Sequence, residues 1–332
     1  MGIMISGVWH DTETTEVQKD GQFIRKESSF RNWITVDGSP GPTGKGGFRA
    51  ESGRYHLYVS YACPWAHRAL IYRCILGLQD AIDISVVHPV NLENGWEFSD
   101  YPAATGDKIN SARYLYEVYA RADPGYSGKV TVPVLWDLET STIVNNESSE
   151  VMRMIGGAFR SIAPNWIDFY PEDLGPSIDE LNEFIYVNIN NGVYRCGFAR
   201  TQDAYDKTVT ALFAALDKLD DRLNDSQYLF GDRIVEADWR LFTTLIRFDP
   251  VYYFHFKCNR RPLRSYINIM RYTSDLLNYP GIRGTIYTDH IIDHYYLAHR
   301  RINPMGIIPV GARMNLDGPP WRKAASKEEG AC

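Results

Sequence analysis

The stretch from Tyr55 to about residue 160 alternates between strand-like and helix-like apolar patterns, and this order constrains the fold more than any other feature. A β-rich run, YHLYVSY, is followed by CPWAHRALIYRCIL, in which apolar residues recur at helical spacing. Next come a strand-like run (AIDISVVHPV), a helical run (NSARYLYEVYARA), two short strand-like runs (VTVPVLWD and STIVNN) and a helix from about Ser148. The predicted order is β-α-β-α-β-β-α, which indicates an α/β domain.

The second half of the chain differs, because its apolar residues follow the helical period alone. Four segments show this period: IDELNEFIYVNINNGVY, TVTALFAALDKLDDRL, EADWRLFTTLIRF and LRSYINIMRYTSDLL. We therefore expect an N-terminal extension (residues 1–50), an α/β domain (51–160), an all-helical domain (161–310) and a polar tail (311–332). The extension is expected to pack on the body of the protein.

Composition narrows the class of protein and of partner. With 332 residues, 44% of them apolar and 23% charged, the chain can form a sizeable core. A formal charge of −6 argues against a nucleic-acid partner, and no apolar run reaches the roughly 18 residues of a membrane span. The five cysteines are odd in number and lack CxxC spacing, which indicates free thiols in a reducing compartment, the cytoplasm.

Cys63 carries the strongest chemical signal, because it lies where a predicted strand ends and a predicted helix begins. Pro64 follows it at the first helical turn, where proline is favoured. Free N–H groups and the positive end of the helix dipole stabilise a thiolate there, so we expect a pKa below the free value of about 8.5. His67 and Arg68, one turn further on, are expected to add positive charge. The alternative is a buried structural cysteine, since free cysteines are often buried.

A second cysteine at the spacing of a redox CxxC motif is missing, because position 66 is Ala66. Any disulfide formed at Cys63 therefore has to be resolved by a thiol from outside the chain. The residues by themselves predict a monothiol enzyme that works with a small thiol.

Several separated strings give the chain a resemblance to a known family. CPWA at a helix start, Val132-Pro133 opening a strand, and Glu147-Ser148 at a helix start resemble the glutathione-binding pattern of thioredoxin-fold glutathione transferases. The strings SYACPWAHR, ENGW, ATGD, TVPVLWD, NNESSE, NNGVY, RFDPVY and INPMGI resemble the Xi class, the glutathionyl-hydroquinone reductases. The resemblance implies a thioredoxin-like N-terminal domain and an all-α glutathione-transferase C-terminal domain. It also implies glutathione as co-substrate, no metal, and a homodimer.

The resemblance assigns roles to individual residues. Cys63 is expected to be the nucleophile, and Val132, before a cis Pro133, is expected to pair its backbone with the cysteinyl part of glutathione. Trp96 is expected to pack on glutathione, with core packing as the alternative. The residues expected to border the tripeptide beside Val132 are Lys129, Val130 and Thr131.

Glu147 and Ser148 are expected to hold the γ-glutamyl end of glutathione. Their chemistry agrees, because a carboxylate suits an ammonium group, and a hydroxyl at a helix start suits a carboxylate. The alternative for Ser148 is a plain helix cap. The family pattern has an arginine where this chain has Lys129, which supplies a point charge without a bidentate fork.

Three tyrosines of the helical half match family motifs: Tyr194 in NGVY, Tyr252 in RFDPVY and Tyr295 in HYY. The resemblance implies that they line the aromatic-substrate pocket. Tyr194 is expected to donate a proton, and Tyr252 and Tyr295 are expected to donate hydrogen bonds to the Cys63 thiolate. Because the chain has 22 tyrosines, core packing is the alternative for each.

The implied activity is glutathione-dependent reduction of S-glutathionyl-hydroquinones through a Cys63–glutathione mixed disulfide, with release of oxidised glutathione. Two other functions stay open. A dehydroascorbate reductase or reductive dehalogenase of similar fold uses the same cysteine chemistry, and a binding or assembly module makes Cys63 dispensable.

Two further patterns are judged structural. His290 and His294 have the spacing of a metal-binding pair but no further ligand motif, so surface or packing histidines are expected. Val235 stands where related helices carry a Ser or Thr cap, and Asp238 is expected to compensate partly through the helix dipole.

Overall fold

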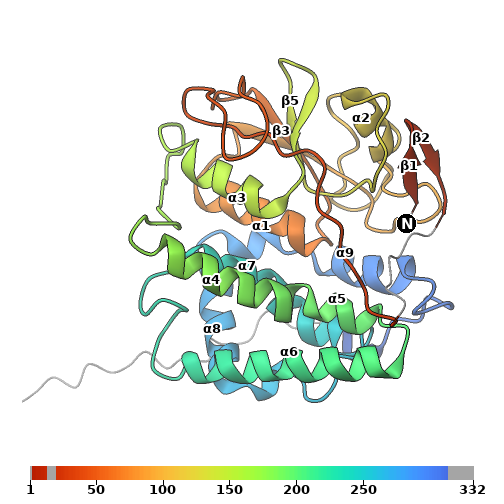
Figure 1. The fold of residues 1–332 in the computed structure, drawn as a ribbon, viewed down its shortest axis with the longest axis vertical. Coiled ribbons are helices and arrows are strands. Elements are labelled where there is room, and N and C mark those ends of the chain that lie inside the picture. Colours follow the sequence, from red (N-terminus) through yellow and green to blue (C-terminus); the bar gives the residue numbers. More distant parts are fainter. Residues whose placement is uncertain (1, 13–19, 313–332) are drawn as a thin grey trace, which may run out of the picture.

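The computed structural model describes residues 2–12 and 20–312, and the α/β half of the chain forms the upper part of the molecule in Figure 1. Its four-stranded sheet has the order β4-β3-β5-β6. β3 and β4 are parallel, and the other pairs are antiparallel. The strands are β3 (Tyr55–Val59), β4 (Ile82–Val86), β5 (Val134–Asp137) and β6 (Thr142–Asn145).

Three helices complete this half: α1 (Pro64–Ile75), α2 (Leu115–Ala122) and α3 (Ser148–Gly157). The order β3-α1-β4-α2-β5-β6-α3 confirms the predicted one. Gly77, with φ of +72°, follows the end of α1 in a conformation that glycine adopts without steric cost. Helix α1 packs against α3 and also against α7 of the helical half (Figure 1). The start of α1 therefore lies at the junction of the two halves.

The lower half of Figure 1 is helical, as predicted. Its α-helices are α4 (Gly175–Ile185), α5 (Gly192–Gly197), α6 (Gln202–Arg222), α7 (Glu236–Arg247), α8 (Ile267–Leu277) and α9 (Thr288–Asp293). Wider π turns follow three of them, at residues 186–190, 248–252 and 294–298. Such turns are frequent at functional sites, and two of these carry Tyr252 and Tyr295.

Three elements differ from the prediction. The helix expected over residues 178–194 is interrupted by the first π turn. A small hairpin, β1 (Ile3–Ile5) and β2 (Val8–His10), was not predicted, because three-residue strands give almost no periodic signal. Helix α9 was missed for the same reason, since its six residues span less than two turns.

The described part of the extension lies against both halves. Met4, Ile34 and Phe48 are buried, and Met4 exchanges backbone hydrogen bonds of 2.9 Å with Gly128. Further along, Thr201 donates to the carbonyl oxygen of Asp20 at 2.8 Å. In Figure 1 this dark red segment runs from the helical half up to the sheet, across the junction.

The start of α7 shows how the chain manages without a hydroxyl cap. Asp238 accepts hydrogen bonds from the N–H of Val235 at 2.7 Å and from the N–H of Leu229 at 3.0 Å. Asp238 thus satisfies free N–H groups directly, beyond the dipole effect that was predicted.

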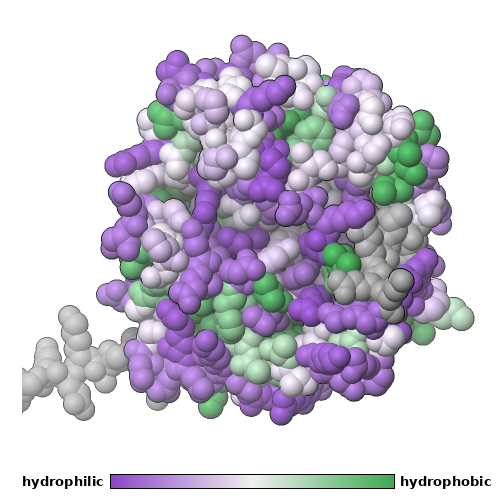
Figure 2. All heavy atoms as spheres, in the orientation of Figure 1, coloured by the Kyte–Doolittle hydropathy of each residue, from purple (hydrophilic) through white to green (hydrophobic). Residues whose placement is uncertain are grey.

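Figure 2 shows polar and charged side chains over most of the face seen in Figure 1, with apolar side chains at the hairpin, where Ile5 and Val8 are exposed. Over the described ranges, no helix has the length and apolar character needed to cross a membrane.

Candidate active site

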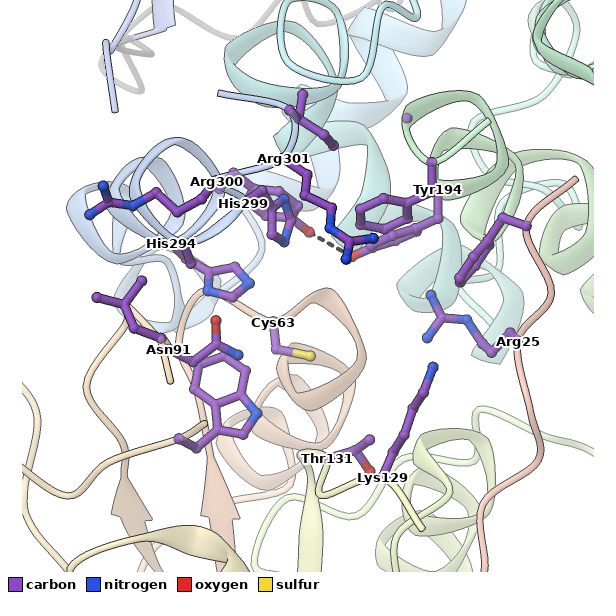
Figure 3. Close-up of a pocket in the computed structure, with 18 of the residues that line it drawn as sticks. Arg25, Cys63, Asn91, Lys129, Thr131, Tyr194, His294, His299, Arg300 and Arg301 are labelled. Atoms are coloured by element: carbon purple, nitrogen blue, oxygen red, sulfur yellow. Dashed lines mark hydrogen bonds between the residues drawn. The ribbon is translucent and has the colours of Figure 1, made fainter. Parts of the chain in front are cut away.

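Two adjoining cavities lie at the junction of the halves. The larger, of about 750 Å³, includes Cys63 in its wall, and the smaller, of about 620 Å³, includes the start of α3. The residues that line both are Phe23, Arg25, Trp65, Lys129, Thr131 and Val132. Because the walls are shared, the two cavities form one continuous cleft, part of which is shown in Figure 3.

Cys63 is the residue before α1, in the loop that follows β3. Its thiol donates a hydrogen bond to the carbonyl oxygen of Val132 at 3.6 Å, and the Val132-Pro133 peptide bond is cis, as predicted. The side chain is largely buried, and its exposed edge faces the larger cavity (Figure 3). The fold thus brings a thiol at a helix start against the loop that ends in Pro133.

The predicted low pKa of Cys63 is wrong. Burial raises the pKa of the thiol above its ordinary value, although the N–H groups of Ala66 and Trp65 and the charges of Arg247 and Arg25 act in the opposite direction. The prediction counted the helix start and left out the desolvation that the helical half and the extension impose.

The positive charge near the thiol also has a different source from the one predicted. His67 is fully buried, and burial together with the charge of Arg247 keeps its pKa far below the usual range, so the ring is neutral. Arg68, whose pKa burial lowers to about 9, points to Ser148 and Asn190 at 3.3 and 2.9 Å. Among the described residues, the charges that act most to lower the pKa of the Cys63 thiol are those of Arg247 and Arg25.

The loop from Lys129 to Val132 forms one wall of the cleft. The hydroxyl of Tyr119 anchors it, donating to the carbonyl oxygen of Thr131 at 2.9 Å and accepting from the N–H of Thr131 at 3.2 Å. Val130 and Val132 are buried, while Lys129 extends into the space between the two cavities, opposite Arg25 (Figure 3). All four residues predicted here line the cleft.

Trp96 both packs and lines the cleft. Its ring stacks on His294, with ring centres 5.1 Å apart and planes 18° from parallel. Both side chains are mostly buried and border the larger cavity. Core packing and a site role are therefore compatible for this residue.

Glu147 and Ser148 lie at the start of α3 and line the smaller cavity. Glu147, rather than Ser148, is the cap, and it accepts hydrogen bonds from the N–H of Ser149 at 3.2 Å and from the hydroxyl of Ser28 at 3.0 Å. Burial alone would raise the pKa of Glu147, but these hydrogen bonds and the charge of Arg68 hold it below its ordinary value. A partly buried carboxylate that stays ionised beside a helix start suits a zwitterionic α-amino acid group.

The three predicted tyrosines come together, but not as expected. The hydroxyl of Tyr295 lies 2.6 Å from that of Tyr194 and 3.1 Å from that of Tyr252. Tyr194 and Tyr295 line the larger cavity, whereas Tyr252 is fully buried behind them. Across the described residues, no tyrosine hydroxyl forms a hydrogen bond with the Cys63 thiol, so the contact expected of Tyr252 and Tyr295 is not observed.

Sequence reasoning missed the arginines of the cleft. Arg25, from the extension, donates to Asn191 at 3.0 Å and lies over the rings of Trp65 and Tyr194, 4.9 Å from each ring centre. Arg300 and other basic side chains border the larger cavity (Figure 3). No local motif marks these residues, because they reach the cleft from segments far from Cys63 in the sequence.

The two histidines four residues apart are packing residues, and neither is on the surface. His290 bonds the carbonyl oxygen of Pro102 at 2.6 Å, and His294 bonds that of Pro89 at 2.8 Å. Burial lowers the pKa of both, that of His294 to about 4. Within residues 2–12 and 20–312, no three His, Cys, Asp or Glu side chains gather in a way that could hold a metal ion.

Cys63, Cys74, Cys196 and Cys258 are free thiols, and Cys74, Cys196 and Cys258 do not line the larger cavity. Cys332 and most of the predicted tail lie outside the described residues.

Comparisons with known proteins agree with this geometry. The family described as "Glutathione S-transferase, N-terminal domain" matches residues 62–157, and "Glutathione S-transferase, C-terminal domain" matches residues 202–273. The chain is 52% identical to glutathionyl-hydroquinone reductase YqjG of Escherichia coli, over 97% of this chain and 98% of that protein. It is 45% identical to glutathionyl-hydroquinone reductase PcpF of Sphingobium chlorophenolicum, over 96% and 98%.

Solved structures give the same result. The glutathione-bound structure of the Escherichia coli YqjG protein is similar with a TM-score of 0.89 at 50% identity, covering 96% of this chain and 98% of that one. A Xi-class glutathione transferase from Natrialba magadii is similar with a TM-score of 0.87 at 44% identity, covering 96% and 95%. The similarity spans both halves of the chain and the cleft between them.

Proposed function

Because the chain belongs to the Xi class of glutathione transferases, the glutathionyl-hydroquinone reductases, we propose that it reduces S-glutathionyl-hydroquinones to hydroquinones with glutathione as co-substrate. The observation that carries the proposal is the position of Cys63. It is the cysteine in the wall of the larger cavity, at a helix start, beside a smaller cavity with an ionised carboxylate.

The glutathione part of the substrate binds along the smaller cavity. Its ammonium group pairs with the ionised Glu147, and its γ-glutamyl carboxylate meets Ser148 and the free N–H groups at the start of α3. The backbone of Val132 pairs with the cysteinyl part, which places the thioether sulfur beside Cys63, whose thiol already touches Val132. Lys129 and Trp96 border the tripeptide from the larger cavity.

The first half-reaction cleaves the thioether. The Cys63 thiolate attacks the substrate sulfur, so an S–S bond forms and the bond from sulfur to the ring carbon breaks. The electron pair of the broken bond goes to the ring carbon, which takes a proton from Tyr194. The hydroquinone then leaves. Burial raises the pKa of Tyr194, so its proton is in place at neutral pH.

The second half-reaction regenerates the Cys63 thiolate. A second glutathione, as thiolate, attacks the glutathione sulfur of the mixed disulfide, which releases oxidised glutathione and the Cys63 thiolate. The proton that this glutathione loses replaces the one that Tyr194 gave up. One thioether and one glutathione thus give one hydroquinone and one oxidised glutathione.

A substrate panel tests the proposal. Purified protein is given a glutathionyl-naphthohydroquinone, dehydroascorbate or a chlorinated hydroquinone, each with glutathione, and oxidised glutathione is measured together with the organic product. The proposal requires turnover of the thioether with equal amounts of hydroquinone and oxidised glutathione. Turnover of dehydroascorbate or loss of chloride without thioether cleavage would overturn it.

We also propose that the protein is a homodimer in the cytoplasm. The resemblance to the family supports the dimer, and the free thiols of the four described cysteines support a reducing compartment. Light scattering at micromolar concentration distinguishes a 38.0 kDa monomer from a dimer.

A further inference from the structure

Arg247 is a buried cation without a carboxylate partner. It is the last residue of α7 and is fully buried, and no Asp or Glu oxygen of the described ranges lies within 4 Å of its guanidinium group. Arg68 is similarly buried and also lacks an ion pair among the described residues, but its partners Ser148 and Asn190 lie away from the nucleophile's turn. Arg240, in contrast, pairs with Glu236 at 3.1 Å. A buried charge without a counter-ion is costly, so the place of Arg247 beside the nucleophile's turn needs an explanation.

The guanidinium group of Arg247 reaches from the helical half into the turn that precedes the nucleophile. Its Nε donates to the carbonyl oxygen of Ala62 at 3.0 Å, and Nη2 donates to that of Tyr61 at 3.2 Å. These two carbonyl groups directly precede Cys63. Nη1 donates to the carbonyl oxygen of Thr243, one turn back in α7, at 2.8 Å. The planar fork therefore ties the nucleophile's turn to α7 at two points.

A chain of hydrogen bonds fixes the other side of the group. Nη1 of Arg247 lies 3.2 Å from Nδ1 of the neutral His67, which can only accept there. The Nε2–H of His67 then donates to the hydroxyl of Thr285 at 2.8 Å, and that hydroxyl donates to the carbonyl oxygen of Ile282 at 2.7 Å. His67 thus carries no charge of its own and holds the guanidinium group in place.

We propose that Arg247 is a positioning residue that serves as the buried counter-charge of the Cys63 thiolate and braces the turn at Tyr61 and Ala62. The inference rests on the proposed role of Cys63 as nucleophile. When Cys63 ionises, the buried guanidinium gains the anion that it otherwise lacks. The carbonyl oxygens of Tyr61 and Ala62, which precede Cys63, accept hydrogen bonds from the guanidinium group, so the negative ends of these two dipoles point toward Arg247.

The other groups around this pair do not supply the same charge. Tyr194, Tyr252 and Tyr295 have pKa values raised by burial, so they are neutral, and His294 is neutral because burial lowers its pKa. The charge of Arg25 also acts to lower the pKa of Cys63, but Arg25 lies in the wall of the open cleft, as Lys129 and Arg300 do. Solvent screens Arg25, whereas it does not reach Arg247.

The test is the pH dependence of Cys63 alkylation by iodoacetamide, with the modified residue identified by peptide mass. Arg247→Gln is expected to move the midpoint to higher pH, so that alkylation at a given pH below it falls by about tenfold or more. Arg247→Lys keeps the charge but loses the fork. It is expected to stay within about threefold of wild type in alkylation, yet to cleave the thioether more slowly at unchanged KM.

Arg54→Gln is the matched control, because it removes an arginine paired with buried Asp137 in the sheet, away from the cleft. It is expected to lower the melting temperature without moving the alkylation midpoint. An unchanged midpoint in folded Arg247→Gln would overturn the proposal. If that variant does not fold, Arg247→Lys provides the test. A wild-type kcat in Arg247→Lys would refute the proposed role of Arg247 in bracing the turn at Tyr61 and Ala62.

Alkylation requires no hydroquinone, so the result is independent of the substrate. A protein that fails to cleave the thioether but shows the alkylation shift refutes the proposed function alone. A protein that cleaves it with an unchanged midpoint in Arg247→Gln refutes the role of Arg247 alone.

Discussion

Replacing Tyr194 with phenylalanine removes one hydroxyl group and keeps the ring, so it isolates the proposed proton transfer. Tyr194 lines the larger cavity, and its hydroxyl lies 2.6 Å from that of Tyr295. Without this acid the ring carbon has to take its proton from water. Loss of a positioned general acid slows such a step by roughly 10²- to 10⁴-fold.

The same change is expected to cost little stability. Tyr295 keeps its hydrogen bond of 3.1 Å to Tyr252, so no hydroxyl of the pair is left without a partner. The loss of one buried hydrogen bond then amounts to about 1 kcal/mol. Against a typical unfolding free energy of about 5–15 kcal/mol, the variant stays folded and its rate can be interpreted.

Rapid-quench measurement of hydroquinone release in a single turnover, together with Cys63 alkylation, separates the two effects. Tyr194→Phe should slow release and leave alkylation unchanged, since no hydrogen bond joins this hydroxyl to the thiol. Tyr296→Phe is the matched control, because Tyr296 is also buried, donates to the carbonyl oxygen of Pro250 at 2.9 Å and does not line the larger cavity. Wild-type release in Tyr194→Phe, or an equal loss in Tyr296→Phe, would refute the assignment.

Three further changes test other parts of the account. Tyr252→Phe should slow turnover less than tenfold, because Tyr252 lies behind Tyr194 and Tyr295 and does not line the larger cavity. A loss as large as that of Tyr194→Phe contradicts this. Ser28→Ala removes the hydrogen bond that holds one carboxylate oxygen of Glu147 in position, so glutathione binding measured by calorimetry should weaken severalfold. Unchanged affinity argues against Glu147 as the ammonium site. Burial raises the pKa of Asp238 to about 6. The folded state therefore holds the proton more tightly than the unfolded chain, and the free energy of unfolding falls by about 3 kcal/mol as pH rises from about 4 to 6. Asp238→Asn should abolish that slope in urea unfolding at pH 4.5 and 7, and a parallel slope in the variant disproves the shift.

Much of the fold could be predicted because the side chains that face the core recur in the sequence at the period of the helix or strand that carries them. The β-rich run at β3 and the helical spacing in α1 report directly on which side chains face the core. The period does not distinguish an α turn from a π turn, so the break at residues 186–190 was invisible. The hairpin and α9 were too short to show any period.

The site was predicted in its parts but not in its electrostatics. Pro64 marks Cys63 as a thiol at a helix start, and the missing second cysteine marks it as a monothiol site. Both signals lie within a few residues of Cys63. The pKa of Cys63 depends instead on what covers it, and those groups come from α7, α5 and the extension. Arg247 and Arg25 belong to no local motif, so their approach to the thiol could only be seen in the folded chain.

The central claim is that Cys63 breaks the thioether by forming a mixed disulfide with glutathione. The most direct measurement is the intact mass of the protein after one equivalent of glutathionyl-hydroquinone without free glutathione, for wild type, Cys63→Ser and Cys74→Ser. Cys74 lies in α1, the helix that Cys63 precedes, but outside the larger cavity, so its variant is the control. The account predicts one added glutathione and one released hydroquinone in wild type and Cys74→Ser, and neither in Cys63→Ser. Hydroquinone release by Cys63→Ser at the wild-type rate would contradict it.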